Sequence, residues 1–193
     1  MMGLSPRKKI LIAAGPGGNG GGGLAGGRHL HNMGADVTVV LATPTDRLIP
    51  EAAAQLRTLS ASGIQVVEPE NLNFSDHDLI VDSIFGYGLH GDPRGRAEEL
   101  IKRMVESDIP ILSNDIPSGV EATSGNVHNP SVKASFTITI AMPKKGLAVK
   151  TARPFVGHLY LCNIAVPPDL YSKSFPDMTM RNPFELSEIV QIW

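Results

Sequence analysis

The chain has 193 residues, of which 42% are hydrophobic and 19% are charged, and its formal net charge is −2. This balance is typical of one globular domain with a substantial core. Without a net basic field, we expect neither a nucleic-acid partner nor an anionic membrane surface as a partner. The single cysteine, Cys162, excludes an intrachain disulfide. No apolar run approaches the length of a membrane span, and the first residues are too polar for a signal peptide, so a cytoplasmic protein is expected.

The N-terminal part of the chain combines an apolar run, a glycine cluster and a helical pattern. Residues 9–14 predict a buried strand that stops at Gly15-Pro16, and residues 24–33 predict a helix. The glycines between them cost conformational entropy on folding, so we expect the backbone to approach a ligand closely there. The start of the helix would then face an anion. A flexible surface turn is the structural alternative.

The rest of the chain alternates predicted strands and helices. Strands are expected at residues 36–42, 64–67, 78–84, 109–113, 134–141 and 155–164, and helices at residues 49–61 and 97–106. This alternation predicts an α/β fold with a mostly parallel sheet and helices on both of its faces. We expect one domain over residues 1–193, in which the mixed, polar residues 169–193 form a tail that packs on its outside or on a partner.

Several unusual residues lie near or after the ends of predicted strands, at the sheet edge where open α/β folds bind ligands. They are the glycine cluster, Asp82, a second glycine loop over residues 86–95 and a turn that begins at Asp115. A dehydrogenase-type site would need an acidic residue after the second strand, where the chain reads Leu41-Ala42-Thr43-Pro44. A Walker-type loop would need Gly-Lys-Ser/Thr after the glycines. A conventional NAD(P)-dependent oxidoreductase is therefore disfavoured.

Four segments resemble the signatures of the NAD(P)H-hydrate epimerase family, also called the YjeF N-terminal domain: GPGGNGGGGL, IVDSIFGYGLHGDPRG, NDIPSGVEATSG and FTITIAMPKKGL. The resemblance covers most of the chain, and it implies a three-layer α/β/α Rossmann-like fold. It also implies an isomerase that interconverts the R and S forms of hydrated NADH and NADPH in nicotinamide nucleotide repair. A separate NAD(P)H-hydrate dehydratase would be its pathway partner.

The resemblance assigns roles to particular residues. Asn19, Asp82 and Ser118 match the family's ligands for a potassium ion (K+), and oxygen donors suit a weakly bound hard cation. Asp115 matches the aspartate that contacts the hydrated nicotinamide ring, so it is the candidate catalytic acid/base. The residues expected to bind the substrate lie in the two glycine segments and at that aspartate: Gly18, Asn19, Gly20, Gly21, Gly22, Gly86, Tyr87, Gly88, Leu89, His90, Gly91, Asp92 and Asp115.

Each assigned role has a structural alternative. Asn19 could cap the first helix, Asp82 could bond only to N–H groups of nearby loops, and Asp115 could cap its own turn. For Lys144 and Lys145, a solvated turn is preferred to a place near the pocket.

The sequence also departs from the family pattern in its first glycine loop. Gly18 stands where the family has asparagine and Gly22 where it has aspartate, so two side chains that could form hydrogen bonds are missing. Loss of a hydrogen bond to a charged group costs about 1.5–3 kcal/mol. A weakened or inactive module that binds nucleotides or proteins is therefore the alternative function. Family members also carry a helical stretch before the first strand, and only about eight residues stand there in this sequence. In the family this stretch often helps to form the dimer, so a homodimer is left open.

Overall fold

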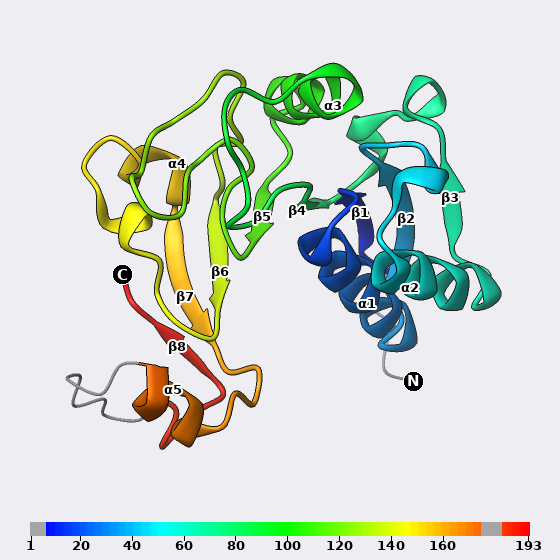
Figure 1. Cartoon of the computed structure of the whole chain (residues 1–193). Coiled ribbons are helices and arrows are strands. Elements are labelled where there is room, and N and C mark those ends of the chain that lie inside the picture. The colour runs from blue at the N-terminus through cyan, green and yellow to red at the C-terminus, as the bar shows by residue number, and fades with distance from the viewer. Residues whose placement is uncertain (1–6, 175–182) are drawn as a thin grey trace, which may run out of the picture.

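The strands of the chain form one eight-stranded sheet in the order β3-β2-β1-β4-β5-β6-β7-β8 (Figure 1). The computed structural model describes residues 7–174 and 183–193. Neighbouring strands are parallel except at the β7–β8 pair, which is antiparallel. The strands are β1 (Lys9–Ala14), β2 (Asp36–Leu41), β3 (Gln65–Val67), β4 (Leu79–Ser83), β5 (Ile111–Asn114), β6 (Phe136–Ile140), β7 (His158–Cys162) and β8 (Ile189–Gln191). The predicted α/β fold with a mostly parallel sheet is confirmed.

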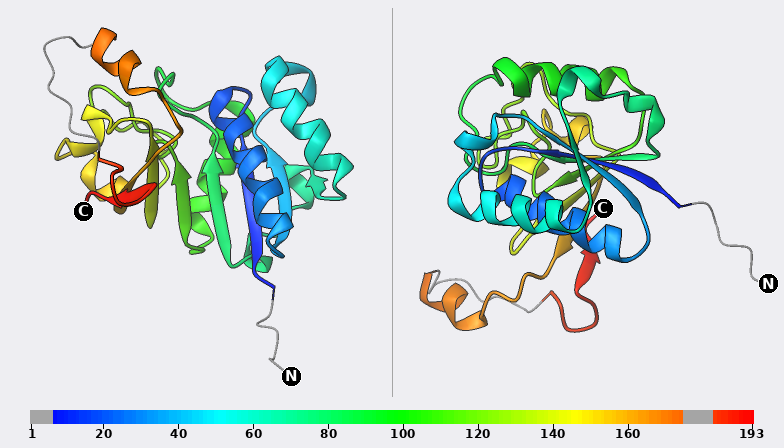
Figure 2. Two further views of the ribbon diagram at one scale, coloured as in Figure 1. Left: turned by 90° about the horizontal axis from the view of Figure 1, so that it is seen from below. Right: turned by 90° about the vertical axis from the view of Figure 1, so that its right-hand side faces the viewer.

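Helices cover both faces of this sheet, as Figure 2 shows in its right-hand view, where α3 lies on one side and α1 and α2 lie on the other. The helices are α1 (Gly18–Asn32), α2 (Pro50–Ala61), α3 (Gly95–Glu106), α4 (Arg153–Val156) and α5 (Pro168–Ser174). Short 3-10 turns occupy Thr45–Arg47, Pro69–Asn71, Phe74–Asp76 and Lys145–Ala148.

Alternation along β1 divides the core between the two faces. Ile10 and Ile12 are buried in the same cluster as Leu24 of α1. Leu11 is buried in a second cluster together with Leu100 of α3. Each such side chain contributes about 1.5–3 kcal/mol when it is fully buried. The apolar faces of the helices therefore hold the three layers together and fix the edge at which the strands end.

Helix α1 begins at Gly18, well before the predicted start at Leu24, so the glycine cluster is helical and the surface-turn alternative is wrong. Its glycines let the helix lie directly against the sheet. A Cβ atom on Gly20 would lie 1.9 Å from the carbonyl oxygen of Gly15, and one on Gly23 would lie 2.3 Å from Oγ of Ser83. Glycine costs about 1 kcal/mol more than alanine within a helix, and this close approach explains why it is used here.

The C-terminal part differs from its prediction in two ways. Residues 153–156 form α4, so β7 is shorter than the strand predicted at residues 155–164. The predicted tail contains α5 and contributes β8, which pairs with β7. Nε1 of Trp193 donates a hydrogen bond to the carbonyl oxygen of Gly157 across 3.0 Å, and the Arg153 guanidinium lies 3.7 Å from the centre of the Trp193 ring. Residues 175–182 of this tail lie outside the described residues.

Within residues 7–174 and 183–193, no helix has both the length and the apolar character needed to cross a lipid bilayer.

Candidate active site

A cavity of about 720 Å³ lies at the carboxyl edge of the sheet, beside the point where the strand order reverses between β1 and β4. Its walls come from five segments that are distant in the sequence: the start of α1, the loop after β4, the end of β5, the end of β6 and the residues after β7. The lining residues are Pro16, Gly17, Gly18, Asn19, Gly22, Ile84, Phe85, Gly86, Tyr87, Gly88, Leu89, Asn114, Asp115, Ile140 and Ile164.

Most of the predicted substrate-binding residues line this cavity, but five do not. Gly20 and Gly21 lie on the buried side of α1, where Gly20 meets the backbone of Gly15 and Gly21 faces Ala52 of α2. The other three, His90, Gly91 and Asp92, are exposed further along the glycine loop.

The Asp82 carboxylate lies beneath the cavity and is fully buried. Its Oδ1 accepts hydrogen bonds from Oγ of Ser118 at 2.6 Å and from the Ile84 N–H at 3.3 Å. Its Oδ2 accepts from Oγ of Ser113 and from the Ser118 N–H, both at 2.8 Å. Hydroxyl groups as well as N–H groups therefore bond to this carboxylate. Burial raises the pKa of Asp82, and among the described residues Asp82 forms no ion pair.

The other two predicted potassium ligands meet at the peptide of Phe85. Nδ2 of Asn19 donates to the Phe85 carbonyl oxygen at 2.7 Å, and the Phe85 N–H donates to Oγ of Ser118 at 2.9 Å. The N-cap position of α1 is Gly17 and Asn19 lies within the helix, so the capping alternative for Asn19 is wrong. The three residues thus form one connected cluster of oxygen donors.

This cluster suits a hard monovalent cation by its chemistry. It combines a carboxylate, a hydroxyl group and an amide, and its buried negative charge has no cationic partner in the described part of the chain. A cation beside Asp82 would offset the cost of burying that charge. Elsewhere in the described residues, no group of three or more His, Cys, Asp or Glu side chains is arranged to hold a metal ion.

Asp115 follows β5 directly and has a left-handed backbone conformation, with φ of 69°. Its Oδ1 accepts hydrogen bonds from Oγ1 of Thr139 at 3.4 Å, from the Ile140 N–H at 3.3 Å, and from Nζ of Lys144. These donors belong to β6 and the segment after it, so Asp115 does not cap its own turn. A left-handed non-glycine residue costs about 1–3 kcal/mol, and such strain is typical of functional sites.

The second carboxylate oxygen of Asp115 faces the cavity. Oδ2 lies 3.6 Å from the position that a Cβ atom on Gly86 would occupy. No donor within the described residues bonds to Oδ2. The turn after β5 therefore presents one free carboxylate oxygen to the cavity while its partner oxygen is held in place.

Two polar side chains at the site were not predicted to belong to it. Asn114 lines the cavity, and its Nδ2 donates to Oδ1 of Asn19 at 2.9 Å. Its position next to Asp115, within the segment NDIPSGVEATSG, could have identified it. Lys144 contacts Asp115, so the preferred interpretation of a solvated turn is wrong for Lys144, whereas Lys145 is exposed.

Asp92 holds the glycine loop to a neighbouring segment. Its Oδ1 accepts a hydrogen bond from the Asn129 N–H at 3.1 Å and contacts Nδ1 of His128 at 3.2 Å, while Nε2 of His128 lies 3.0 Å from Oε1 of Glu121. The Asn129 N–H bond, with His128 beside it, lowers the pKa of Asp92. The side chain of Asp92 thus has a structural role in positioning the loop, whose earlier residues line the cavity.

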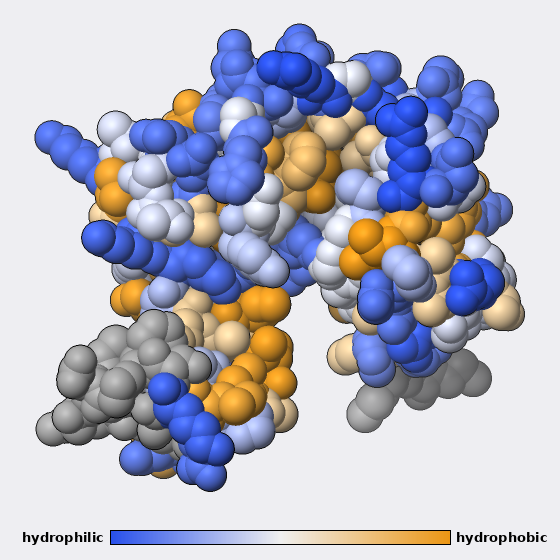
Figure 3. Space-filling view, in the orientation of Figure 1, coloured by the Kyte–Doolittle hydropathy of each residue, from blue (hydrophilic) through white to orange (hydrophobic). Residues whose placement is uncertain are grey.

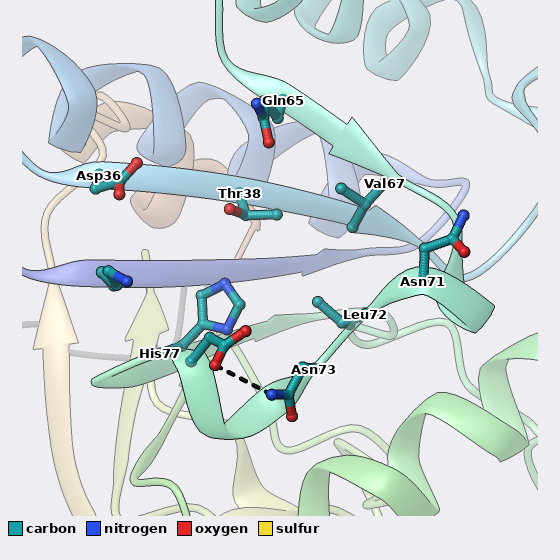
Figure 4. Close-up of a pocket in the computed structure, with 10 residues that line it drawn as sticks. Asp36, Thr38, Gln65, Val67, Asn71, Leu72, Asn73 and His77 are labelled. Carbon is teal, nitrogen blue, oxygen red and sulfur yellow. Dashed lines mark hydrogen bonds between the residues drawn. The ribbon is translucent and has the colours of Figure 1, made fainter.

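A second, smaller cavity of about 190 Å³ lies against β1–β3 (Figure 4). Asp36 and Thr38 of β2 and His77 lie around it, and Asn73 forms a hydrogen bond with Asp76 at 3.0 Å. None of the predicted site residues lines it. Its place near the starts of β1 and β2 separates it from the edge where the predicted site residues gather.

Comparison with known proteins places the sequence in one family. Residues 1–146 match the family model described as YjeF-related protein N-terminus. The chain is 36% identical over 184 residues to an NAD(P)H-hydrate epimerase of Dehalogenimonas lykanthroporepellens, covering 95% of this chain and 73% of that protein. It is 33% identical over 181 residues to an NAD(P)H-hydrate epimerase of Plasmodium vivax, covering 92% of this chain and 61% of that protein.

Two further matches concern a longer enzyme and a solved structure. The chain is 33% identical over 171 residues to the bifunctional NAD(P)H-hydrate repair enzyme Nnr of Moorella thermoacetica, of which it spans 32%. The crystal structure of the yeast protein ynu0 has the same fold, with a TM-score of 0.78 at 21% identity over 100% of this chain and 82% of the yeast chain. The chain belongs to the YjeF N-terminal, or NAD(P)H-hydrate epimerase, family.

Proposed function

We propose that this chain is an NAD(P)H-hydrate epimerase, an isomerase that interconverts the R and S forms of hydrated NADH and NADPH. The names and coverage of its relatives support this assignment. The observation that carries it is Asp115, which presents a free Oδ2 to a cavity of about 720 Å³ while three donors hold its Oδ1. Such a cavity has the size of a small-molecule site.

The proposed chemistry takes place at C6 of the hydrated nicotinamide ring, which carries the hydroxyl group. Inversion at this carbon requires the C6–oxygen bond to break, with its electron pair leaving on oxygen, and a new C6–oxygen bond to form on the opposite face of the ring. The departing oxygen must gain a proton and the arriving water must lose one. Oδ2 of Asp115 is the side-chain atom that we assign to this proton exchange.

We further propose that the cluster of Asn19, Asp82 and Ser118 binds a potassium ion beside the substrate. The buried charge of Asp82 and the oxygen donors around Phe85 support this. The ion would supply positive charge close to the substrate phosphates. We assign the backbone N–H groups of Gly86 and Gly88, on the loop that lines the cavity, to the phosphates themselves.

For partners and location, we propose a cytoplasmic enzyme that acts together with an NAD(P)H-hydrate dehydratase. The dehydratase is proposed because relatives of twice this chain's length or more are named bifunctional NAD(P)H-hydrate repair enzymes. We also propose a homodimer. Apolar side chains gather around α5 and the end of β7 (Figure 3), and Ile164, Leu170 and Ile189 there are 49%, 52% and 48% exposed. Sedimentation of the purified chain tests the dimer directly.

The decisive experiment mixes the purified chain with the R-hydrate at a pH where uncatalysed epimerisation is slow, and follows the appearance of the S-hydrate. We expect acceleration by the wild type and a loss of about 10²–10⁴-fold in Asp115→Asn, the usual range for removal of a general acid/base. Asp108→Asn is the matched control, because Asp108 is also a left-handed aspartate, with φ of 56°, but is exposed. Absence of acceleration by the wild type would overturn the proposed function.

A further inference from the structure

We infer that Lys144 is a positioning residue for the proposed epimerisation, which fixes the Asp115 carboxylate so that Oδ2 faces the substrate. This inference rests on the proposed function. It concerns a residue outside the cavity wall, in a segment that otherwise resembles a surface turn.

The Lys144 side chain forms its hydrogen bonds with Asp115 and with the backbone beside it. Its Nζ donates to Oδ1 of Asp115 and, at 2.7 Å, to the carbonyl oxygen of Ile140. The Lys144 side chain is 18% exposed and that of Asp115 is 5% exposed, so the pair is largely removed from water. Among the described residues, Lys144 is the only charged side chain that contacts Asp115.

The backbone around Lys144 places its side chain beside Asp115. Ala141 has a left-handed conformation with φ of 63°, and the Met142 N–H donates to the Ile140 carbonyl oxygen at 2.7 Å, so the chain turns sharply after β6. Beyond Lys144, the Gly146 N–H donates to the carbonyl oxygen of Ala122 at 2.7 Å. A Cβ atom on Gly146 would lie 2.3 Å from the Glu121 carbonyl oxygen, so this segment is packed tightly against its neighbour.

The hydrogen bonds that the described residues donate to the Asp115 carboxylate all go to one of its two oxygens, and this leaves the other oxygen free to react. Lys144, Thr139 and the Ile140 N–H all bond to Oδ1, and they leave Oδ2 toward the cavity. Two of these bonds are long, at 3.4 and 3.3 Å, and come from neutral donors, whereas Lys144 donates from a charged group. A hydrogen bond from a charged donor is about twice as strong as a neutral one, so Lys144 makes the strongest of the three. Its ammonium group also offsets the cost of burying the negative charge. Without Lys144, only the two long hydrogen bonds hold the carboxylate, and the position of the reacting oxygen is less well fixed.

The neighbouring residue provides a matched control. Lys145 carries the same charge one position later in the chain, is exposed, and forms no ion pair in the described part of the chain. Lys145→Met therefore repeats the change in net charge and in side-chain type without touching Asp115.

The experiment measures kcat and KM for epimerisation of the R-hydrate in the wild type, Lys144→Met, Lys144→Arg and Lys145→Met, with a thermal unfolding curve for each. We expect Lys144→Met to lower kcat about tenfold or more while KM changes less than about threefold, because the loss concerns the reacting group and not binding. Lys144→Arg should recover most of the loss, because it keeps the cation and its donors. Lys145→Met should match the wild type.

Two further results separate this inference from the proposed function and from a folding defect. An active wild type with an unchanged kcat in Lys144→Met overturns the role of Lys144 alone, whereas an inactive wild type overturns both proposals. Should Lys144→Met unfold, Lys144→Gln takes its place, since it stays polar but is shorter and lacks the ammonium group that bonds to Oδ1 of Asp115. Equal kcat values for folded Lys144→Gln and the wild type would also overturn the inference.

Discussion

Nδ2 of Asn114 donates a hydrogen bond to Oδ1 of Asn19 across 2.9 Å, which ties the end of β5 to the first turn of α1. Asn19 in turn donates from its own Nδ2 to the carbonyl oxygen of Phe85 at 2.7 Å. Three of the five segments that line the cavity are thus linked by two side chains. Gly22 leaves room for this link, because a Cβ atom there would lie 3.2 Å from Nδ2 of Asn114.

Replacing Asn114 should therefore weaken substrate binding without unfolding the chain. In Asn114→Ala, Asn19 loses the hydrogen bond to its Oδ1 and the longer one, at 3.4 Å, to its carbonyl oxygen. The shorter bond is worth about 0.5–1.5 kcal/mol, so we expect the dissociation constant for the substrate to rise about two- to tenfold. Calorimetric titration with the hydrate measures it. Asn32→Ala, at the exposed far end of the same helix, is the control and should bind as the wild type does. An equal affinity in both variants would remove Asn114 from the site.

The glycines of α1 should respond to alanine in opposite directions. A Cβ atom on Gly26 meets nothing within 4 Å, so Gly26→Ala should stabilise the chain by about 1 kcal/mol through helix propensity. A Cβ atom on Gly20 would lie 1.9 Å from the backbone oxygen of Gly15, so Gly20→Ala should destabilise it or prevent folding. Urea unfolding measures both. Loss of stability in Gly26→Ala would contradict the close-packing account of this helix.

Much of this architecture could be predicted from the sequence, because it follows from patterns within single segments. The apolar run of β1 predicted a strand with correct bounds at Lys9–Ala14, and strand–helix alternation predicted the parallel sheet. The helical structure of the glycine cluster was harder to predict, because glycine disfavours a helix locally. Its reason lies in contacts with Gly15 and Ser83, which no local pattern contains.

The site also contains some residues that the sequence could identify and others that it could not. Asp82, Asp115 and Ser118 could be identified because they lie at or shortly after the ends of β4 and β5, at the same edge of the sheet, within segments that resemble the family signatures. Lys144 could not, because its contact with Asp115 depends on the sharp turn at Ala141 and links positions 29 residues apart. The anchoring of Asp92 by His128 and Asn129 also depends on packing between distant loops.

The contacts of Asp92 with Asn129 and His128, which hold the glycine loop in place, make the stability of the fold depend on pH. The Asn129 N–H lowers the pKa of Asp92, and the Ser124 hydroxyl and then His128 lower that of Glu121. Each folded-state pKa lies below its unfolded value, so the contribution is fully present above the unfolded pKa and is lost as the pH falls through the folded pKa. Asp92→Asn should thus lower the melting temperature at pH 6 and converge with the wild type toward pH 3. A difference in melting temperature that stays constant over that range would contradict this account. The control is Asp76→Asn, at an exposed position.

Potassium should stabilise the folded chain, because only the folded state brings Asn19, Asp82 and Ser118 together. A ligand at one hundred times its dissociation constant adds about 2.7 kcal/mol, and each kcal/mol raises the melting temperature by about 2–4 °C for a chain of this size. Replacing tetramethylammonium chloride by potassium chloride at constant ionic strength should therefore raise the melting temperature by several degrees. The rise should disappear in Asp82→Asn, which is close to Asp82 in size and removes the buried charge, and persist in Asp36→Asn, at the start of β2. Equal melting temperatures of the wild type in the two salts would argue against a cation at this cluster.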